Sequence, residues 1–190
     1  MELREFAARV VHSESLDLKL DPPPSGLTDE EPGEAERPES PGRPEALRFV
    51  PADQARVPPL EGLADRAQRV RILHAFANHE LQAAELFGWA LLAFPEAPRE
   101  FRVEAAAILF EEQCHTRMYL ARLADHGSAL GDFPVSGYFW SKVPAIRTPL
   151  QFVCAMCLTF ENANLDHTVE YAAAAAEAGD PKSAAVIEQI

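Results

Sequence analysis

Four side chains in this sequence of 190 residues have the types and the spacing of metal ligands. They are Glu80, Glu112, His115 and Glu161, and each lies on the apolar face of an expected helix. A buried carboxylate without a partner costs roughly several kcal/mol or takes up a proton. Three such carboxylates in one helical domain therefore indicate a shared cation.

The most specific local pattern is Glu112-x-x-His115, in which a carboxylate and an imidazole stand three residues apart. At this spacing both side chains project from the same face of a helix, so that one ion can contact both. Glu111 is a competing ligand, because it lies four residues from His115. The face that carries Glu111 is less apolar, and we therefore assign the site to Glu112.

The predicted ligands follow one another along the chain as Glu80, then Glu112 with His115, then Glu161. Carboxylate-bridged di-metal sites in four-helix bundles take a Glu from each of two helices and Glu-x-x-His from each of the other two. Carboxylates and imidazole suit both iron and manganese. We expect two iron ions, with manganese as an alternative, and we expect Glu112 to bridge the first ion to the second.

Three further residues near these positions are expected to have structural roles. His79 lies about 100° around the helix from Glu80, which favours core packing or a hydrogen bond to a ligand over metal ligation. Tyr119 follows His115 by one turn and is expected to pack in the core, with a role near the metals as the alternative. His167 is assigned to a face away from Glu161.

The three cysteines, Cys114, Cys154 and Cys157, lie within expected helices. Their odd number argues against a disulfide framework and favours a reducing cytosol. The Cys154-x-x-Cys157 pair also fits a zinc or redox site. A zinc site would need two more ligands, however, and a redox pair normally follows a strand. We therefore expect both residues to be small buried hydrophobic groups.

The helices that position these residues are indicated by apolar residues at spacings of three and four. A Pro-free stretch with Glu80 at its centre predicts a helix of about seven turns, and Gly127 is suited to end the next helix. Pro149 is suited to the first turn of the third helix, which Gly179 ends. The pattern predicts helices over 65–93, 98–126 and 148–178, and a fourth helix from Pro181.

These elements predict an all-α fold, namely a four-helix bundle with a long crossover. The crossover is expected over residues 127–147, because Glu112 and Glu161 are 49 residues apart whereas Glu80 and Glu112 are 32 apart. The same step of 32 from Glu161 places a second Glu-x-x-His near position 193. We therefore expect the fourth helix to be truncated at the C-terminus, with weak or no metal binding unless another chain completes the bundle.

The first part of the chain has a different composition. Apolar residues from Leu3 to Val10 predict one short amphipathic helix. Residues 21–59 hold 10 of the 16 prolines, and proline is excluded from helix interiors and central strands. We expect a Pro-rich extended arm that is either draped over the domain or mobile. The chain is thus divided into residues 1–60, a short helix with its arm, and residues 61–190, the bundle.

The formal net charge is −13, and the acidic residues are spread over the whole chain. Such a surface repels phosphate, which argues against nucleic acid and anionic membranes as partners. The chain has no run of 18 apolar residues, and its N-terminus lacks the apolar core of a signal peptide. We therefore expect a cytoplasmic protein.

Five segments resemble the uncharacterised ferritin-like family known as domain of unknown function 455. They are Leu73–Ala83, Glu111–His115, Gly131–Pro134, Glu161–Asp166 and Pro41–Pro44. The resemblance implies a ferritin-like bundle with a di-metal site and, by analogy with the wider superfamily, oxygen-dependent chemistry. It does not specify a substrate. It also implies a further Asp-Glu-x-x-His-Val-like segment, which would follow position 190.

Three functions fit these observations. The first is a di-iron oxidoreductase, an oxidase or hydroxylase that uses O₂ to oxidise a small-molecule substrate. The second is iron handling or storage, and the third is a non-catalytic structural bundle with an incomplete metal site. An incomplete bundle would expose apolar surface, which favours a homo-oligomer.

Overall fold

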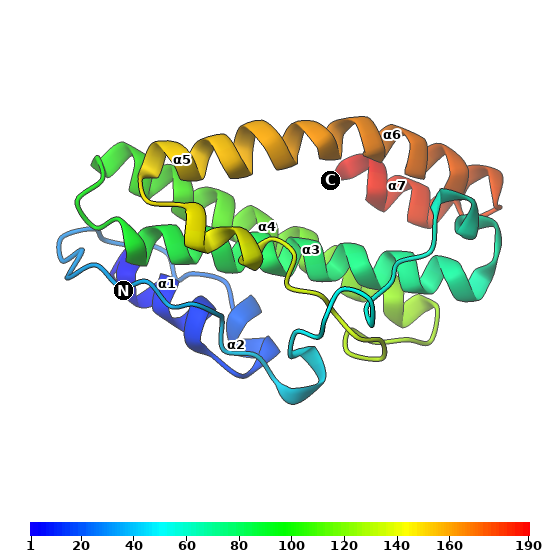
Figure 1. Ribbon diagram of the computed structural model, residues 1–190, viewed down its shortest axis with the longest axis horizontal. Helices are drawn as coiled ribbons and strands as arrows, with labels where there is room; N and C mark the ends of the chain where they lie inside the picture. The colour runs from blue at the N-terminus through cyan, green and yellow to red at the C-terminus, as the bar shows by residue number, and fades with distance from the viewer.

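The computed structural model is all-α, with two long helices side by side at its centre (Figure 1). It describes the backbone of residues 1–190 and the side chains of residues 1–158 and 167–190. This backbone contains no strand, and its only β pairing consists of isolated bridges between Glu2 and Thr28 and between Phe49 and Val135. Within the described residues, no helix combines the length and the apolar character needed to cross a bilayer.

The central pair consists of α3 (Arg66–Ala93) and α4 (Arg99–Asp125), which confirms two of the predicted helices. The helix α3 begins where the Asp65 side chain accepts a hydrogen bond from the backbone N–H of Gln68. The helix α4 ends before Gly127, whose φ of 78° lies in the region that glycine adopts most readily. A short connection turns the chain back, so the two helices pack along their length.

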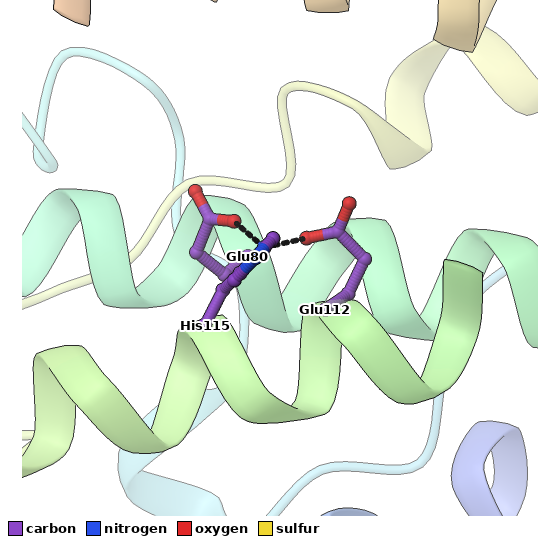
Figure 2. A group of neighbouring side chains, drawn as sticks. All are labelled: Glu80, Glu112 and His115. Atoms are coloured by element: carbon purple, nitrogen blue, oxygen red, sulfur yellow. Dashed lines mark hydrogen bonds and ion pairs between the residues drawn. The ribbon is translucent and has the colours of Figure 1, made fainter. Parts of the chain in front are cut away.

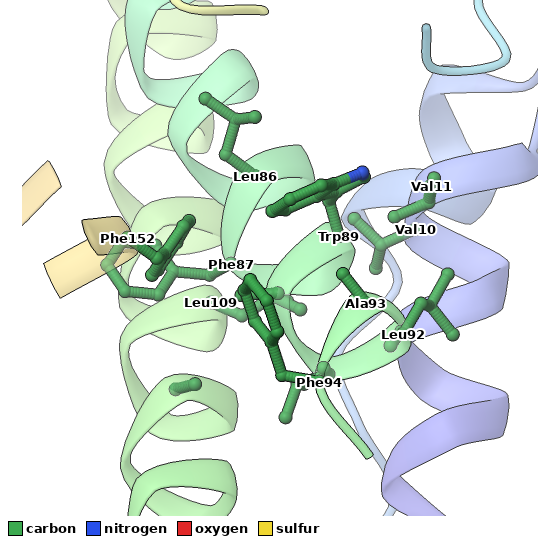
Figure 3. Close-up of a cluster of buried hydrophobic side chains, with 14 of the residues drawn as sticks. Val10, Val11, Leu86, Phe87, Trp89, Leu92, Ala93, Phe94, Leu109 and Phe152 are labelled. Atoms are coloured by element: carbon green, nitrogen blue, oxygen red, sulfur yellow. The ribbon is translucent and has the colours of Figure 1, made fainter. Parts of the chain in front are cut away.

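One end of this pair is closed by a large apolar cluster (Figure 3). The helix α1 (Leu3–His12) contributes its apolar face, and Phe6 and Val10 are fully buried there. On the α3 side, Trp89 and Phe94 pack edge to face with ring centroids 5.6 Å apart. Burial of this kind is the main favourable term in folding, so α1 is part of the principal core.

Residues 21–59 run over the central pair with little regular structure. The only short helices around this stretch are α2 (Leu16–Leu20), η1 (Glu45–Leu47) and η2 (Leu60–Ala64). The stretch is fixed by polar contacts instead: the N–H of Glu36 donates to the carbonyl of Leu92 at 2.9 Å. Its path also requires close backbone approach, because a Cβ on Gly42 would lie 2.0 Å from the carbonyl oxygen of His12.

The third helical run differs from its prediction. After the short η3 (Trp140–Ala145), it consists of α5 (Pro149–Val153), a π-helical segment η4 (Cys154–Phe160) and α6 (Glu161–Glu177). The sequence predicted one regular helix over 148–178. The expectation that Cys154 is buried is wrong, since its side chain is exposed.

The π-helical segment explains which side of this run faces the core. Phe152 is fully buried near its start and Ala175 near its end. In a regular α-helix, the 23 positions between them turn through about 2,300°, which would place them about 140° apart. A π-turn holds more residues than an α-turn and so rotates less per residue. The segment η4 therefore lets both residues face inward, a device that a constant helical period cannot predict.

The last helix, α7 (Pro181–Gln189), packs against α6 and fills one end of the space between α6 and the central pair (Figure 1). Asp180 begins it by accepting a hydrogen bond from the N–H of Ser183. Its buried residues Ala184 and Ile187 join a second apolar cluster with residues of α3, α4 and α6. Ile190 lines the same cavity as Phe76 and Glu80, so the end of this helix lies close to the middle of α3.

Candidate metal centre

Three of the four predicted ligands meet between the two central helices (Figure 2). Glu80 comes from the middle of α3, and Glu112 and His115 come from one turn of α4. Each offers one ligand atom, and these three atoms lie within 4.8 Å of one another. The i to i+3 spacing on α4 and the packing of α4 on α3 are sufficient to produce this arrangement.

His115 lies between the two carboxylates. Its Nδ1 atom is 3.3 Å from Oε2 of Glu112 and 3.5 Å from Oε2 of Glu80. Only 6% of Glu112 is exposed. Among the described side chains, His115 is the only cationic partner of either carboxylate. The cluster therefore combines two acids with one imidazole in a largely buried place.

The environment shifts the proton affinities of this cluster. Burial, reinforced by the nearby Glu80 carboxylate, raises the pKa of Glu112 to about 8, although the hydrogen bond from His115 opposes the change. Hydrogen bonds to Glu112 and Glu80 raise the pKa of His115 to about 10 against the effect of burial. The cluster thus retains protons that a bound cation would displace.

The structure also distinguishes between the alternative ligands on α4. Glu111 is exposed, whereas Glu112 is buried and belongs to the cluster. The predicted ligand Glu161 begins α6, but its side chain lies outside the described residues. The described side chains that could hold a metal ion together are therefore those of Glu80, Glu112 and His115.

A cavity of about 380 Å³ lies beside the cluster. Its wall includes Glu80 and Tyr119 from the central pair, and Ile187 from α7. Tyr119 is 3% exposed and packs against Phe76 with ring centroids 5.8 Å apart, which agrees with the predicted core position. Burial raises the pKa of Tyr119, so its hydroxyl retains its proton.

Two further histidines lie near the cluster without belonging to it. His79 packs between aromatic rings, with Phe139 at 5.2 Å, and burial lowers its pKa to about 4. This agrees with the predicted packing role. His167 lines the same cavity as Glu80, together with Thr168 and Tyr171 of α6. Its orientation away from Glu161 stays a prediction, because the side chain of Glu161 lies outside the described residues.

Sequence reasoning missed a second buried carboxylate on α3. Glu85 is fully buried, and its Oε1 atom is 3.0 Å from Nζ of Lys19. Its Oε2 atom is 2.8 Å from the Arg43 guanidinium and accepts a hydrogen bond from Nε1 of Trp140 at 3.1 Å. The one available sequence signal was Arg43, a cation held between Pro41-Gly42 and Pro44 in the arm.

Comparisons with known proteins give one match. The model of a family described as "Protein of unknown function (DUF455)" matches residues 3–190. No curated protein and no solved structure matches the chain significantly. The match covers the central helices, the arm and all three residues of the cluster.

Proposed function

The chain belongs to the DUF455 family, and on that premise we propose that it is a ferritin-like protein with a carboxylate-bridged di-metal centre that activates O₂. In this proposal Glu80, Glu112 and His115 would hold one ion, and Glu161 together with Glu112 would contribute to the second. Iron is the proposed metal, with manganese as the alternative.

One observation carries this proposal. Two largely buried carboxylates and an imidazole converge within 4.8 Å, and the described side chains supply no Lys or Arg to balance them. A divalent cation would replace the protons of this cluster and neutralise both acids. Oxygen and nitrogen donors in this combination fit iron and manganese better than softer metals. Glu80, Glu112 and His115 therefore fit the iron or manganese ions that a ferritin-like bundle implies.

Each residue has a distinct task in this centre. Glu80 and Glu112 approach from different helices, so together they fix the position of the metal relative to both. His115 supplies a neutral donor once its proton has been displaced. Bound ferrous ions would supply the electrons for reduction of O₂. Tyr119 keeps a protonated hydroxyl on the wall of the adjacent cavity, where it can donate a hydrogen bond to a small molecule.

Metal content after anaerobic loading with Fe(II) tests the centre directly. The wild-type chain, Glu112→Ala and Glu111→Ala would be loaded, desalted and measured by elemental analysis. Glu111→Ala is the matched control, because it removes an adjacent but exposed carboxylate from the same helix. We expect bound iron, up to about two ions per chain, in the wild type and the control, and a sharp loss in Glu112→Ala. Equal iron in all three proteins would contradict the proposal.

Oxygen consumption separates catalysis from storage. A di-iron oxidase or hydroxylase consumes O₂ repeatedly when a reductant is supplied, without gaining iron. An iron-storage protein consumes O₂ only as Fe(II) is added and accumulates iron far beyond the ligand sites. Absence of bound metal would instead leave a structural bundle whose carboxylates are satisfied by protons.

A further inference from the structure

A second and larger cavity lies on the other side of His79. Its volume is about 1060 Å³, at the upper end of the usual range for small-molecule sites, roughly 300–1,000 Å³. Its walls come from the arm, from α3 and from the segment that includes η3. We refer to it as the arginine cleft, after Arg37, Arg56 and Arg147 in its lining.

The three arginines give the cleft a local positive charge. Among the described residues that line it, Glu39 is the only acidic one, whereas the whole chain has a formal net charge of −13. In the part of the chain with described side chains, none of the ion pairs involves Arg37, Arg56 or Arg147. The contacts of Arg37 to the carbonyls of Ile146 and Arg147 are long, at 3.4 and 3.5 Å. Guanidinium groups are therefore available to an anion.

The same cleft offers apolar aromatic surface. Trp89 and Trp140 line it, and the N–H groups of both indoles are already donated, to the carbonyl of Pro38 and to Glu85 respectively. Trp89 is 1% exposed and Trp140 is 3% exposed, so the two indoles form the apolar floor of the cleft. The aromatic surface that a ligand can contact comes from Tyr138, which is 52% exposed, and from the half-buried Phe49.

His79 connects the cleft to the proposed metal centre. Its ring lines both the arginine cleft and the smaller cavity that contains Glu80. Trp89 follows it by ten residues on α3, a distance of about 15 Å along the helix axis. A ligand that extends along α3 could thus place one end near Arg37 and Arg147 and the other against His79.

We propose that the arginine cleft binds an organic anion with a planar apolar body, and that such anions are the substrate class of the metal centre. Arg37 and Arg147 hold the carboxylate, sulfonate or phosphate group, while Tyr138 and Phe49 contact the apolar body. The role as substrate rests on the proposed function, whereas the binding itself does not.

Fluorescence titration with two related dyes tests the binding. The dye 8-anilinonaphthalene-1-sulfonate is a planar anion, and N-phenyl-1-naphthylamine is a similar molecule without charge. We expect Arg147→Ala and Arg37→Ala each to weaken binding of the anionic dye by about tenfold, because each change removes one charge-assisted contact. Arg99→Ala is the matched control, because Arg99 is also exposed but lies outside the cleft. Equal weakening in this control, or no preference for the anionic dye, would overturn the proposal.

Bound Co(II) tests the link to the metal centre, because this ion quenches a fluorophore only at short range. We expect Co(II) to quench the bound anionic dye in the wild type but not in Glu112→Ala. If the wild type does not bind Co(II) but still binds the dye in an arginine-dependent way, the proposed function is wrong and the anion site in the cleft is supported. Bound Co(II) without quenching would show that the dye is elsewhere, which would defeat the inference.

Discussion

Glu80 and Glu85 are two largely buried carboxylates on one helix, only five residues apart, with very different surroundings. Glu85 is paired with two cations, Lys19 and Arg43, both of them buried. Glu80 has another carboxylate, Glu112, as its neighbour and shares a single imidazole with it. One acid is over-neutralised by the protein, and the other is left short of positive charge.

The difference separates a structural site from a candidate binding site. A buried acid that serves stability is paired with charges from the same chain, because an unpaired charge in the interior is costly. A buried acid that awaits a cation is left under-compensated, and the cost is borne by shifted pKa values, as at Glu112 and His115. Matched Glu-to-Gln substitutions at the two sites should therefore have opposite effects on the free energy of unfolding.

The largest effect is expected at the paired site. The change Glu85→Gln leaves Lys19 and Arg43 buried without their acid, which should reduce the free energy of unfolding by about 3–5 kcal/mol. For a chain of this size, that loss corresponds to a fall in Tm of roughly 6–20 °C. Thermal and urea unfolding would measure it. A loss below about 1 kcal/mol would mean that the network is not a stabilising one.

A third ionisable group on α3, His74, should make stability depend on pH. Its Nε2 atom accepts hydrogen bonds from the N–H groups of Gly131 and Phe133, and burial lowers its pKa from 6.5 to about 4. The unfolded chain therefore binds this proton first, so stability falls as the pH falls from 6.5 to 4. The contribution of His74 to this loss is about 3 kcal/mol.

Urea unfolding at several pH values would isolate that contribution. The variant His74→Asn keeps a hydrogen-bond acceptor but cannot take up a proton, so it should lack this part of the pH dependence. Identical pH profiles for the variant and the wild type would exclude His74 as the cause.

Metal binding should stabilise the under-compensated site. Mn(II) is suitable for this test because it is oxidised less readily than Fe(II). At a Mn(II) concentration of 100 times Kd, binding should add about 2.7 kcal/mol to the free energy of unfolding. The gain should persist in Glu111→Ala and disappear in Glu112→Ala. Thermal unfolding with and without Mn(II) would measure it, and a gain of the same size in Glu112→Ala would place the ion elsewhere.

The smallest effect is expected for Glu80→Gln in metal-free protein. This change relieves the repulsion between two adjacent carboxylates and keeps the shape of the side chain. We expect the free energy of unfolding to stay within about 1 kcal/mol of the wild type, without a net loss. The same change should remove the stabilisation by Mn(II). A loss as large as that for Glu85→Gln would show that Glu80 is also a structural residue.

The fold of the central pair could be predicted because its signals are local. The bounds of α3 and α4 follow from apolar periodicity, a Pro-free stretch and a terminal Gly, and the structure agrees with the predicted ranges within one residue. The cluster could be predicted for the same reason, since Glu112 and His115 belong to one turn and Glu80 interrupts an otherwise apolar stripe. The side chain of Glu161 is not described, so its role stays a prediction.

The remaining features depend on contacts between distant parts of the chain. Glu85 is paired with residues 42 and 66 positions earlier, and no periodicity indicates such a pairing. The π-helical segment η4 changes which side of the third helical run is buried, which a constant helical period cannot reveal. The position of His167 in the cavity wall depends on how α6 lies against its neighbours, and sequence spacing does not fix that either.

The turn of α4 that includes Glu112 contacts α3 on one side and the N-terminal part of the chain on the other. Next to Glu112, the buried side-chain amide of Gln113 donates to the backbone carbonyls of Lys19 at 2.6 Å and of Asp21 at 3.3 Å. The turn that carries Glu112 and His115 is thereby tied to the residues at the start of the 21–59 stretch. Metal binding at Glu112 and the order of the backbone around Lys19 and Asp21 are then thermodynamically coupled. Such coupling is reciprocal. A cation between the helices should slow amide hydrogen exchange in a segment more than 90 positions earlier in the chain.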